Sequence, residues 1–386
     1  MNEVFLDKLI KELIDNGSVV DTEKLKNRVK DIIVNNKIDA FLNELERVIM
    51  EYQLNPENEV NTISVTIGID DNKINLSNQK IDNNTLFDVA SITKLFVLKL
   101  VYEFEKQGLI KYTDKIKDIC PEFADLDGYT VIDAIKMYGK IETDGKLSSA
   151  INKENFNRIL GSVKLIDYSY QSSNYTDIGF IVLGYVLETI SGLTLQGLMD
   201  KYILKVYDLN YTMFNPDTEK YTLLGNGNNI GMPQDYKTRI NDGVTGAAGL
   251  FTNSIDMLKL STLLYDYEFF DENFVKEMLE NYFIDDKERK RSYGGLYISN
   301  NDNDISYAPK EFSDITLAHQ GFTGSVVIFD LKNRMHISIL LDAIKLNASK
   351  KAEKFIDNFY VFKNVIVEYS LILYLLAHYN SKSSVN

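Results

Sequence analysis

The sequence predicts an α+β fold in which an antiparallel β-sheet is flanked by helices and an all-helical domain is inserted between its strands. Apolar and polar residues alternate at 62–69, and the apolar runs 325–330 and 335–342 are joined by a short turn, as is typical of strands. Residues 114–232 show mostly helical periodicity with frequent Asn and Gly. Because this helical stretch separates the strand segments, it is predicted to be an insertion.

Three helices are predicted before the first strand. The apolar side chains of the first helix recur at helical spacing: Leu6, Leu9, Ile10, Leu13 and Ile14. A second helix is expected to start at Asp21 or Thr22 and to end near Val34, and a third covers about 39–52. The first two helices fall outside the predicted sheet region, so we interpret residues 1–36 as an N-terminal helical extension.

The rest of the chain, residues 37–386, is predicted to form one domain with two parts. Residues 37–113 and 233–386 form the α/β part, and residues 114–232 form the helical part.

Two helices of this domain are strongly apolar. One is expected to start near Ser91 and to end near Gly108. The other contains the most apolar stretch of the chain, 365–377, which includes Glu368 and is shorter than the ~20 residues that a membrane-spanning helix needs. We therefore predict a buried C-terminal helix.

The composition excludes several classes of function. The 386 residues include 42 Lys and Arg against 56 Asp and Glu, giving a net charge of −14 with no basic cluster, so no nucleic-acid partner is expected. The single cysteine, Cys120, can form neither an internal disulfide nor a Cys-rich zinc site, and no metal-binding motif occurs, so no metal and no cofactor are predicted. The first residues lack the pattern of a signal peptide, so we expect a cytoplasmic protein without a membrane partner.

The candidate nucleophile is Ser91. Lys94 follows it by three residues, which places both side chains on one helical face, where the amine can take the hydroxyl proton. Ser77 and Lys80 have the same spacing but lie in a polar turn. Ser91 instead begins a long apolar helix, whose N-terminal amides point at whatever the serine attacks, so this context favours Ser91.

A second element is the triplet of Tyr175, Thr176 and Asp177, which precedes an apolar helix closed by Gly192. The same triplet occurs at 112–114, and the chain has 24 tyrosines, so core packing or surface exposure is the ordinary role of any one of them. Tyr175 stands out because it directly precedes a buried helix of the helical part, where a loop can present its phenol to a cleft.

A third element is His319, Gln320 and Gly321, which leads into the strand at 325–330. The chain has three histidines, and the other two lie within a strand and near the C-terminus, where structural or exposed positions are expected. The glycine beside His319 lets a strand backbone approach a ligand closely.

Two glycine clusters, 225–231 and 242–251, are predicted to be loops. The first lacks both the spacing and the preceding strand of a dinucleotide-binding motif. The second contains small residues that either line the floor of a cleft or pack tightly.

A resemblance to the serine β-lactamase and penicillin-binding-protein superfamily is carried by four segments in this order: LFDVASITKLF, YTDIGFIVLG, AGLFTNSIDML and HQGFTGSVVIFD. The chain looks most like the class C type with its esterase and D-alanyl-D-alanine carboxypeptidase relatives. The likeness covers about residue 40 to the end. The family's β-lactamase/transpeptidase-like fold, an α/β domain with an antiparallel sheet plus a helical domain, agrees with the fold predicted above.

The resemblance implies Ser91 as the nucleophile, Lys94 as its proton-accepting partner and Tyr175 as the second acid/base group. It also implies that backbone amides of Ser91 and Phe322 hold the oxyanion. The residues that it assigns to the substrate-binding site are Asp177, His319, Gly321 and Phe322.

The sequence departs from the penicillin-recognising pattern at two positions. Asp177 stands where the β-lactamases usually have Asn, and His319 replaces the Lys of the third motif, as in esterase-like and peptidase-like branches. A permanently charged Lys helps to hold a substrate carboxylate, whereas His is about half charged or less near pH 7. We therefore expect little turnover of β-lactams.

These observations predict a serine hydrolase that cleaves an ester or amide bond of a small substrate through an acyl-enzyme on Ser91, with a preference for esters. Either Lys94 or Tyr175 takes the serine proton. For Lys94 to do so near neutral pH, burial or a nearby cation must lower its pKa by about 3 units.

Two alternatives stay open at this point. One is a peptidase or amidase that acts on D-amino-acid-containing or other small peptides, or a weak β-lactamase. The other is a non-catalytic binding or assembly protein that uses the N-terminal helices as its contact surface, for instance in self-association, since a fold alone does not guarantee activity.

Overall fold

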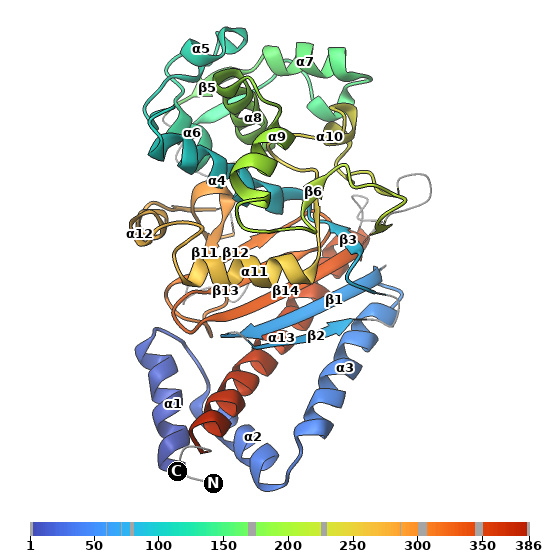
Figure 1. Ribbon diagram of the computed structural model, residues 1–386, viewed down its shortest axis with the longest axis vertical. Helices are drawn as coiled ribbons and strands as arrows, with labels where there is room; N and C mark the ends of the chain where they lie inside the picture. The colour runs from blue at the N-terminus through green and yellow to red at the C-terminus, as the bar shows by residue number, and fades with distance from the viewer. Residues whose placement is uncertain are drawn as a thin grey trace.

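The computed structural model describes residues 3–58, 60–70, 72–77, 81–168, 175–224, 230–285, 287–299, 307–343 and 350–383. Figure 1 shows three regions along the long axis: a helical part, a central β-sheet, and a group of helices at the end that holds both termini.

An eight-stranded antiparallel sheet, in the order β2-β1-β14-β13-β12-β11-β10-β9, forms the centre of the molecule. In chain order its strands are β1 (Val60–Ile69), β2 (Asn72–Ser77), β9 (Phe283–Ile284), β10 (Lys290–Arg291), β11 (Tyr297–Ile298), β12 (Thr316–Gln320), β13 (Val326–Asp330) and β14 (Met335–Ala343). The segments at 325–330 and 335–342 pair as β13 and β14, and β14 pairs with the distant β1. The predicted fold class is confirmed.

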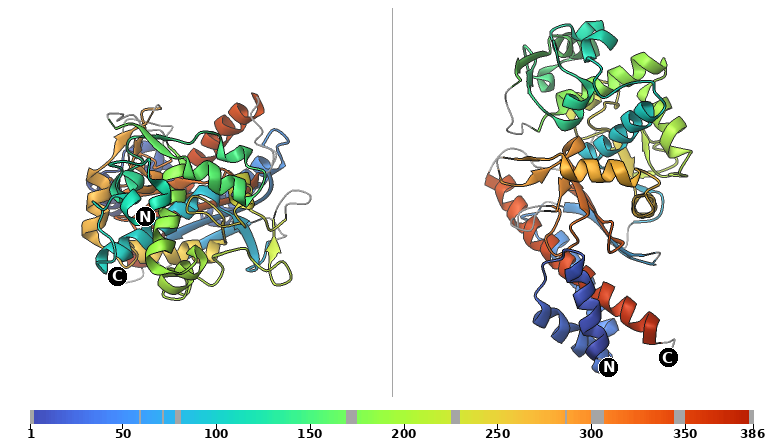
Figure 2. Two further views of the ribbon diagram at one scale, coloured as in Figure 1. Left: turned by 90° about the horizontal axis from the view of Figure 1, so that it is seen from above. Right: turned by 90° about the vertical axis from the view of Figure 1, so that its left-hand side faces the viewer.

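Helices from both ends of the chain form a group on one side of the sheet (Figure 2). They are α1 (Glu3–Asp15), α2 (Thr22–Val34), α3 (Ile38–Leu54) and α13 (Lys350–Ser383). The helices α3 and α13 pack on the sheet, while α1 and α2 pack on α13. The apolar stripe of β1, which includes Ile63, Val65 and Ile67, is buried in this layer.

The segment between α1 and α2 is tied to the loop before β12. The Val19 N–H donates to the Lys310 carbonyl at 2.8 Å, and the Asp314 N–H donates to the Asn16 carbonyl at 3.1 Å. Leu9 is 1% exposed and belongs to the same apolar cluster as the sheet. The first two helices therefore share the core of the sheet layer.

Helix α13 contains a segment, Asp357–Asn380, that is long and apolar enough to cross a membrane, with a mean hydropathy of 1.5. The protein itself buries 72% of its most apolar window, as expected for a core helix. The cytoplasmic location suggested by the sequence stays a prediction.

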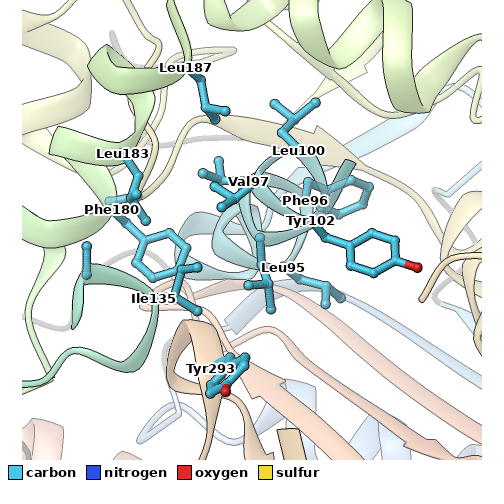
Figure 3. Packing of buried hydrophobic residues seen from close by; sticks show 14 of the residues in the cluster. Leu95, Phe96, Val97, Leu100, Tyr102, Ile135, Phe180, Leu183, Leu187 and Tyr293 are labelled. Carbon is cyan, nitrogen blue, oxygen red and sulfur yellow. The ribbon is translucent and has the colours of Figure 1, made fainter. Parts of the chain in front are cut away.

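The opposite face of the sheet carries α11 (Ser254–Tyr265) and, beyond it, the helical part. At the centre of that part is α4 (Thr93–Lys106), whose residues Thr93 to Tyr102 are all buried. Figure 3 shows its apolar side chains among those of neighbouring elements, including Phe180, Leu183 and Tyr293. Burial on all sides explains why apolar residues surround this helix on every face, with Lys94 and Lys99 as buried exceptions.

The other helices near α4 are short except for α8. They are α5 (Ile116–Ile119), α6 (Val131–Lys136), α7 (Lys153–Gly161), α8 (Asp177–Ser191), α9 (Leu195–Met199), α10 (Tyr236–Ile240) and α12 (Glu272–Glu280). The stretch 114–232 also contains short strands: β4 (Lys140–Glu142), β5 (Lys164–Asp167), β6 (Met213–Phe214) and β7 (Thr222–Leu223). The last two join β3 (Thr85–Asp88) and β8 (Leu250–Thr252) in a small second sheet.

Candidate active site

Ser91 lies in a 3-10 turn, Ala90–Ile92, that leads directly into α4. The turn is strained, because Ala90 has a φ of +44°, in the left-handed region that residues with a Cβ seldom adopt. The buried carboxylate of Asp88 holds it, with Oδ1 accepting the Ala90 N–H at 2.9 Å and Oδ2 the Gln234 N–H at 2.6 Å. Burial raises the pKa of Asp88 to about 6 despite these hydrogen bonds.

Lys94 is fully buried beneath Ser91. Its Nζ donates to Ser91 Oγ at 3.0 Å, to Asp177 Oδ1 at 2.8 Å and to the Ala247 carbonyl at 3.1 Å. An ammonium group has three N–H donors and no acceptor, so these three oxygens match the charged form of the lysine. The predicted pairing of Ser91 with Lys94 is thus present in the structure.

The charge balance also favours the ammonium form of Lys94. Burial lowers the pKa of Lys94, but the Asp177 carboxylate and the Tyr175 phenol outweigh burial and raise it above its ordinary value. Burial raises the pKa of Asp177, and Lys94 and Lys237 together hold it well below its usual range. A base near neutral pH requires a lowered pKa, and the pKa of Lys94 is instead raised, so Lys94 does not meet this requirement.

Lys237, on α10, is a second lysine on the same carboxylate. Its Nζ donates to Asp177 Oδ2 at 2.7 Å and lies 3.3 Å from Asp235 Oδ1. Burial lowers the pKa of Lys237, but these two carboxylates raise it to a larger extent. Both oxygens of Asp177 are thus occupied by lysines, one from α4 and one from α10.

The ring of Tyr175 lies between two cations. Lys94 Nζ is 4.9 Å from the ring centroid, and the guanidinium carbon of Arg291 is 4.7 Å from it. Gly295 packs against the ring, because a Cβ at that position would lie 2.5 Å from Tyr175 Cε2. The phenol is thereby brought next to Lys94, and 36% of the residue stays exposed.

His319 lies behind the wall of the site. It is 1% exposed, with Nδ1 3.0 Å from the Gln320 carbonyl and Nε2 3.1 Å from the Gly294 carbonyl. Burial and the charge of Lys94 lower the pKa of His319 to about 3, so the ring is neutral at pH 7. The side chain that the sequence places in the substrate site is thus buried and does not line the cavity.

A cavity of about 490 Å³ opens above Ser91. Five of the seven predicted site residues line it: Ser91, Tyr175, Asp177, Gly321 and Phe322. Lys94 lies below its floor, and Gln320 contributes to the wall in place of His319. The arrangement can deliver a hydroxyl nucleophile, a buried cation and a phenol to one bound carbonyl group.

The other sequence candidates are resolved differently. Lys80 and most of the cluster 225–231 lie outside the described residues. Tyr112, in the repeated triplet, packs near Phe274, away from the cavity. In the cluster 242–251, residues 242–249 form a close-packed loop next to the site, since a Cβ on Gly246 would collide with the Phe180 carbonyl, and residues 250–251 belong to β8 and not to a loop. This loop supplies the Ala247 carbonyl to Lys94.

Three functional candidates escaped the sequence analysis: Asp88, Lys237 and Arg291. Asp88 lies within the quoted segment around Ser91, so its position three residues before the serine was a usable signal. Lys237 is 60 residues from Asp177, and nothing in the local pattern connects the two. Among the residues that the structure describes, no group of three or more His, Cys, Asp or Glu side chains could hold a metal ion.

The fold and the Ser91–Lys94–Tyr175 cluster together define a serine hydrolase. The model of the beta-lactamase family matches residues 53–355, and the chain belongs to that family.

A putative D-alanyl-D-alanine carboxypeptidase of Salmonella enteritidis is 25% identical over 307 residues, which cover 67% of this chain and 69% of the relative. The structure of D-amino acid amidase from Ochrobactrum anthropi has a TM-score of 0.65 at 11% identity and covers 88% of this chain and 99% of the amidase.

An octameric penicillin-binding protein homologue from Pyrococcus abyssi has a TM-score of 0.60 at 17% identity, with 78% and 73% of the two chains covered. At these identities the solved structures establish likeness of fold. Self-association of the present chain through its N-terminal helices stays a prediction.

Proposed function

We propose that this protein hydrolyses an ester or amide bond of a small substrate through an acyl-enzyme on Ser91. The observation that carries the proposal is the 3.0 Å hydrogen bond from Lys94 Nζ to Ser91 Oγ, at the floor of a cavity that Tyr175 also lines. The attack of Oγ on the substrate carbonyl forms the acyl-enzyme and releases an alcohol or amine, and one water then releases the acid and restores the serine.

The pair of Lys94 and Tyr175 accepts the proton of Ser91. Because the Asp177 carboxylate favours the ammonium form of Lys94, we assign the phenol oxygen of Tyr175, which lies beside that ammonium, as the group that accepts the proton. The same oxygen then protonates the leaving group. The cations of Lys94 and Arg291 lie against the ring on which negative charge develops during this transfer.

The negative charge that develops on the substrate carbonyl needs a second set of donors. Ser91 and Phe322 both line the cavity, and we assign their backbone amides to the oxyanion site. The loss of one such donor typically costs ~3 kcal/mol of transition-state stabilisation.

The preference for esters is supported by the neutral, inward-turned ring of His319 at the third motif. No permanent cation stands at that position to hold a substrate carboxylate. A second candidate, a D-amino-acid peptidase or amidase, is favoured by the names of the curated relative and of one structural neighbour.

A panel of substrates tests the proposal: short p-nitrophenyl esters, a D-alanyl-D-alanine peptide, a D-amino acid amide and a chromogenic cephalosporin, each with wild-type protein and Ser91→Ala. We expect the esters to be hydrolysed fastest and all turnover to be lost in the variant. Turnover of the peptide or amide alone would move the assignment to the second candidate, and activity that persists in Ser91→Ala would reject both.

A further inference from the structure

The two cations in the cavity wall are already committed to protein carboxylates. Lys237 lies 2.7 Å from Asp177 and 3.3 Å from Asp235. A substrate carboxylate next to Lys237 would share the charge of the lysine with these two carboxylates and would lie close to both. The added negative charge would therefore be poorly compensated.

Arg291 is the second cation of the wall, and it is only 8% exposed. Its Nε donates to Asp285 at 3.0 Å, its Nη1 donates to the Gly295 carbonyl at 3.0 Å, and its Nη2 bonds the hydroxyl of Tyr297. Each of the three guanidinium nitrogens thus has a partner in the protein. Little of Arg291 is open to a ligand, and Asp285, which also contacts Arg289, offsets part of its charge.

The charge of Lys94 is also shared, since Asp177 accepts one of its hydrogen bonds below the cavity floor. Among the described residues that line the cavity, Lys237 and Arg291 are the only Lys, Arg or His side chains.

Apart from Asp177, Asp235, Lys237 and Arg291, the residues that line the cavity are uncharged, and several of them are aromatic. Phe322 is 63% exposed and Tyr236 is 41% exposed, although both are large side chains that line the cavity. Gln320 adds a neutral amide to the same wall. Exposed aromatic rings beside a few polar groups are typical of a pocket that binds an apolar or aromatic ligand.

We infer that this cavity selects neutral substrates, namely esters or amides with an aromatic or apolar group and without a carboxylate beside the scissile bond, and that the absence of a positive charge at position 320 contributes to this selectivity. The inference rests on the proposed function and makes it narrower. It also separates the chain from an enzyme that removes a C-terminal amino acid, because such a substrate must present a carboxylate.

A matched pair of esters tests the selectivity: phenyl acetate and 3-acetoxybenzoate, which differ in one carboxylate on the leaving group. We expect kcat/KM to be at least about tenfold higher for phenyl acetate, since a buried carboxylate without a partner cation loses a charge-assisted hydrogen bond. Gln320→Lys introduces an ammonium into the wall and should lower the ratio of kcat/KM for phenyl acetate to that for 3-acetoxybenzoate about tenfold. The matched control Gln320→Met adds no charge and should leave this ratio unchanged.

A binding assay reports on the same selectivity without turnover. Phenylboronic acid and 3-carboxyphenylboronic acid both form reversible adducts with an active serine, so each can protect Ser91 from a fluorophosphonate probe. Protection at a lower concentration of the neutral compound supports the inference.

The inference is wrong if the wild-type protein hydrolyses 3-acetoxybenzoate at least as well as phenyl acetate and binds 3-carboxyphenylboronic acid at least as tightly as phenylboronic acid. The proposed serine hydrolase activity would still be supported in that case. If folded Gln320→Lys shows the same ratio of kcat/KM values for the two esters as the wild type, residue 320 has no part in the selectivity. If Gln320→Lys does not fold, the wild-type comparison decides alone. If the wild type shows neither hydrolysis nor labelling of Ser91, the proposed function fails and the inference falls with it.

Discussion

Replacing Gly295 with alanine should displace Tyr175 without changing any group that takes part in the proposed chemistry. The new Cβ would lie 2.5 Å from Tyr175 Cε2, and real Cβ atoms essentially never approach a heavy atom within 3.0 Å. The ring must therefore shift by about 0.5 Å at least, the difference between these two distances, and by about 1 Å to reach ordinary packing. A misplacement of about 1 Å can cost about 100-fold in rate, so we expect kcat to fall about 10- to 100-fold.

Gly128→Ala is the matched control for this prediction. Gly128 has a φ of +79° against +73° for Gly295, so both variants carry a similar backbone penalty, of about 1–2 kcal/mol. A Cβ on Gly128 meets no atom within 4 Å. Both variants should lose stability in thermal unfolding, Gly295→Ala by more because of its contact with Tyr175, and ester hydrolysis should show a loss of kcat in Gly295→Ala alone. Equal activity in the two variants would refute the assigned position of Tyr175.

Three further predictions concern stability and the site. His319 and His336 are buried, and their pKa values are lowered from the ordinary 6.5 to about 3. Their contribution to the free energy of unfolding is therefore complete above pH 6.5 and falls as the pH drops below it. Each histidine should lower the free energy of unfolding by about 2 kcal/mol at pH 5 relative to pH 8. Denaturant unfolding at both pH values checks this, and His336→Gln should remove about half of the difference. Lys237→Met removes the lysine that contacts Asp177 Oδ2 and should lower kcat about tenfold or more, whereas Lys237→Arg should recover activity. Equal activity in the two variants would contradict a role for the positive charge at this position. Leu9→Ala should cost about 2–5 kcal/mol in one cooperative transition, whereas separate melting of the N-terminal helices would contradict their place in the core.

The sequence was most informative where chemistry depends on local spacing. Ser91 and Lys94 are three residues apart at the start of a helix, and this spacing alone places the amine within reach of the hydroxyl. The strands at 62–69 and 335–342 were predicted from their patterns, and their burial against α13 follows from the same alternation.

The position of His319 could not be predicted in the same way. Successive side chains of a strand point to opposite faces, so either His319 or Gln320 must face the cavity, and the motif does not say which. Register with β13, which pairs His319 with Val327, and packing against the Gly294 carbonyl place the imidazole behind the wall.

Long-range pairing explains the other differences. The ion pair of Lys237 with Asp177 joins α10 to the start of α8, and no local pattern contains that contact. The amphipathic pattern of the first helix predicts that its apolar face is buried, but the pattern does not identify the element that covers this face. That element is α13, which lies at the opposite end of the chain.

The central claim is that Ser91 is an activated nucleophile, and the most direct test is the reaction of the full-length protein with a fluorophosphonate probe followed by mass-spectrometric mapping. The hydrogen bond from Lys94 and the strained turn at Ala90 predict a single adduct on Ser91, with no adduct in Ser91→Ala and slower labelling in Lys94→Met. An unlabelled wild-type protein, or equal labelling in wild type and Ser91→Ala, would contradict the claim.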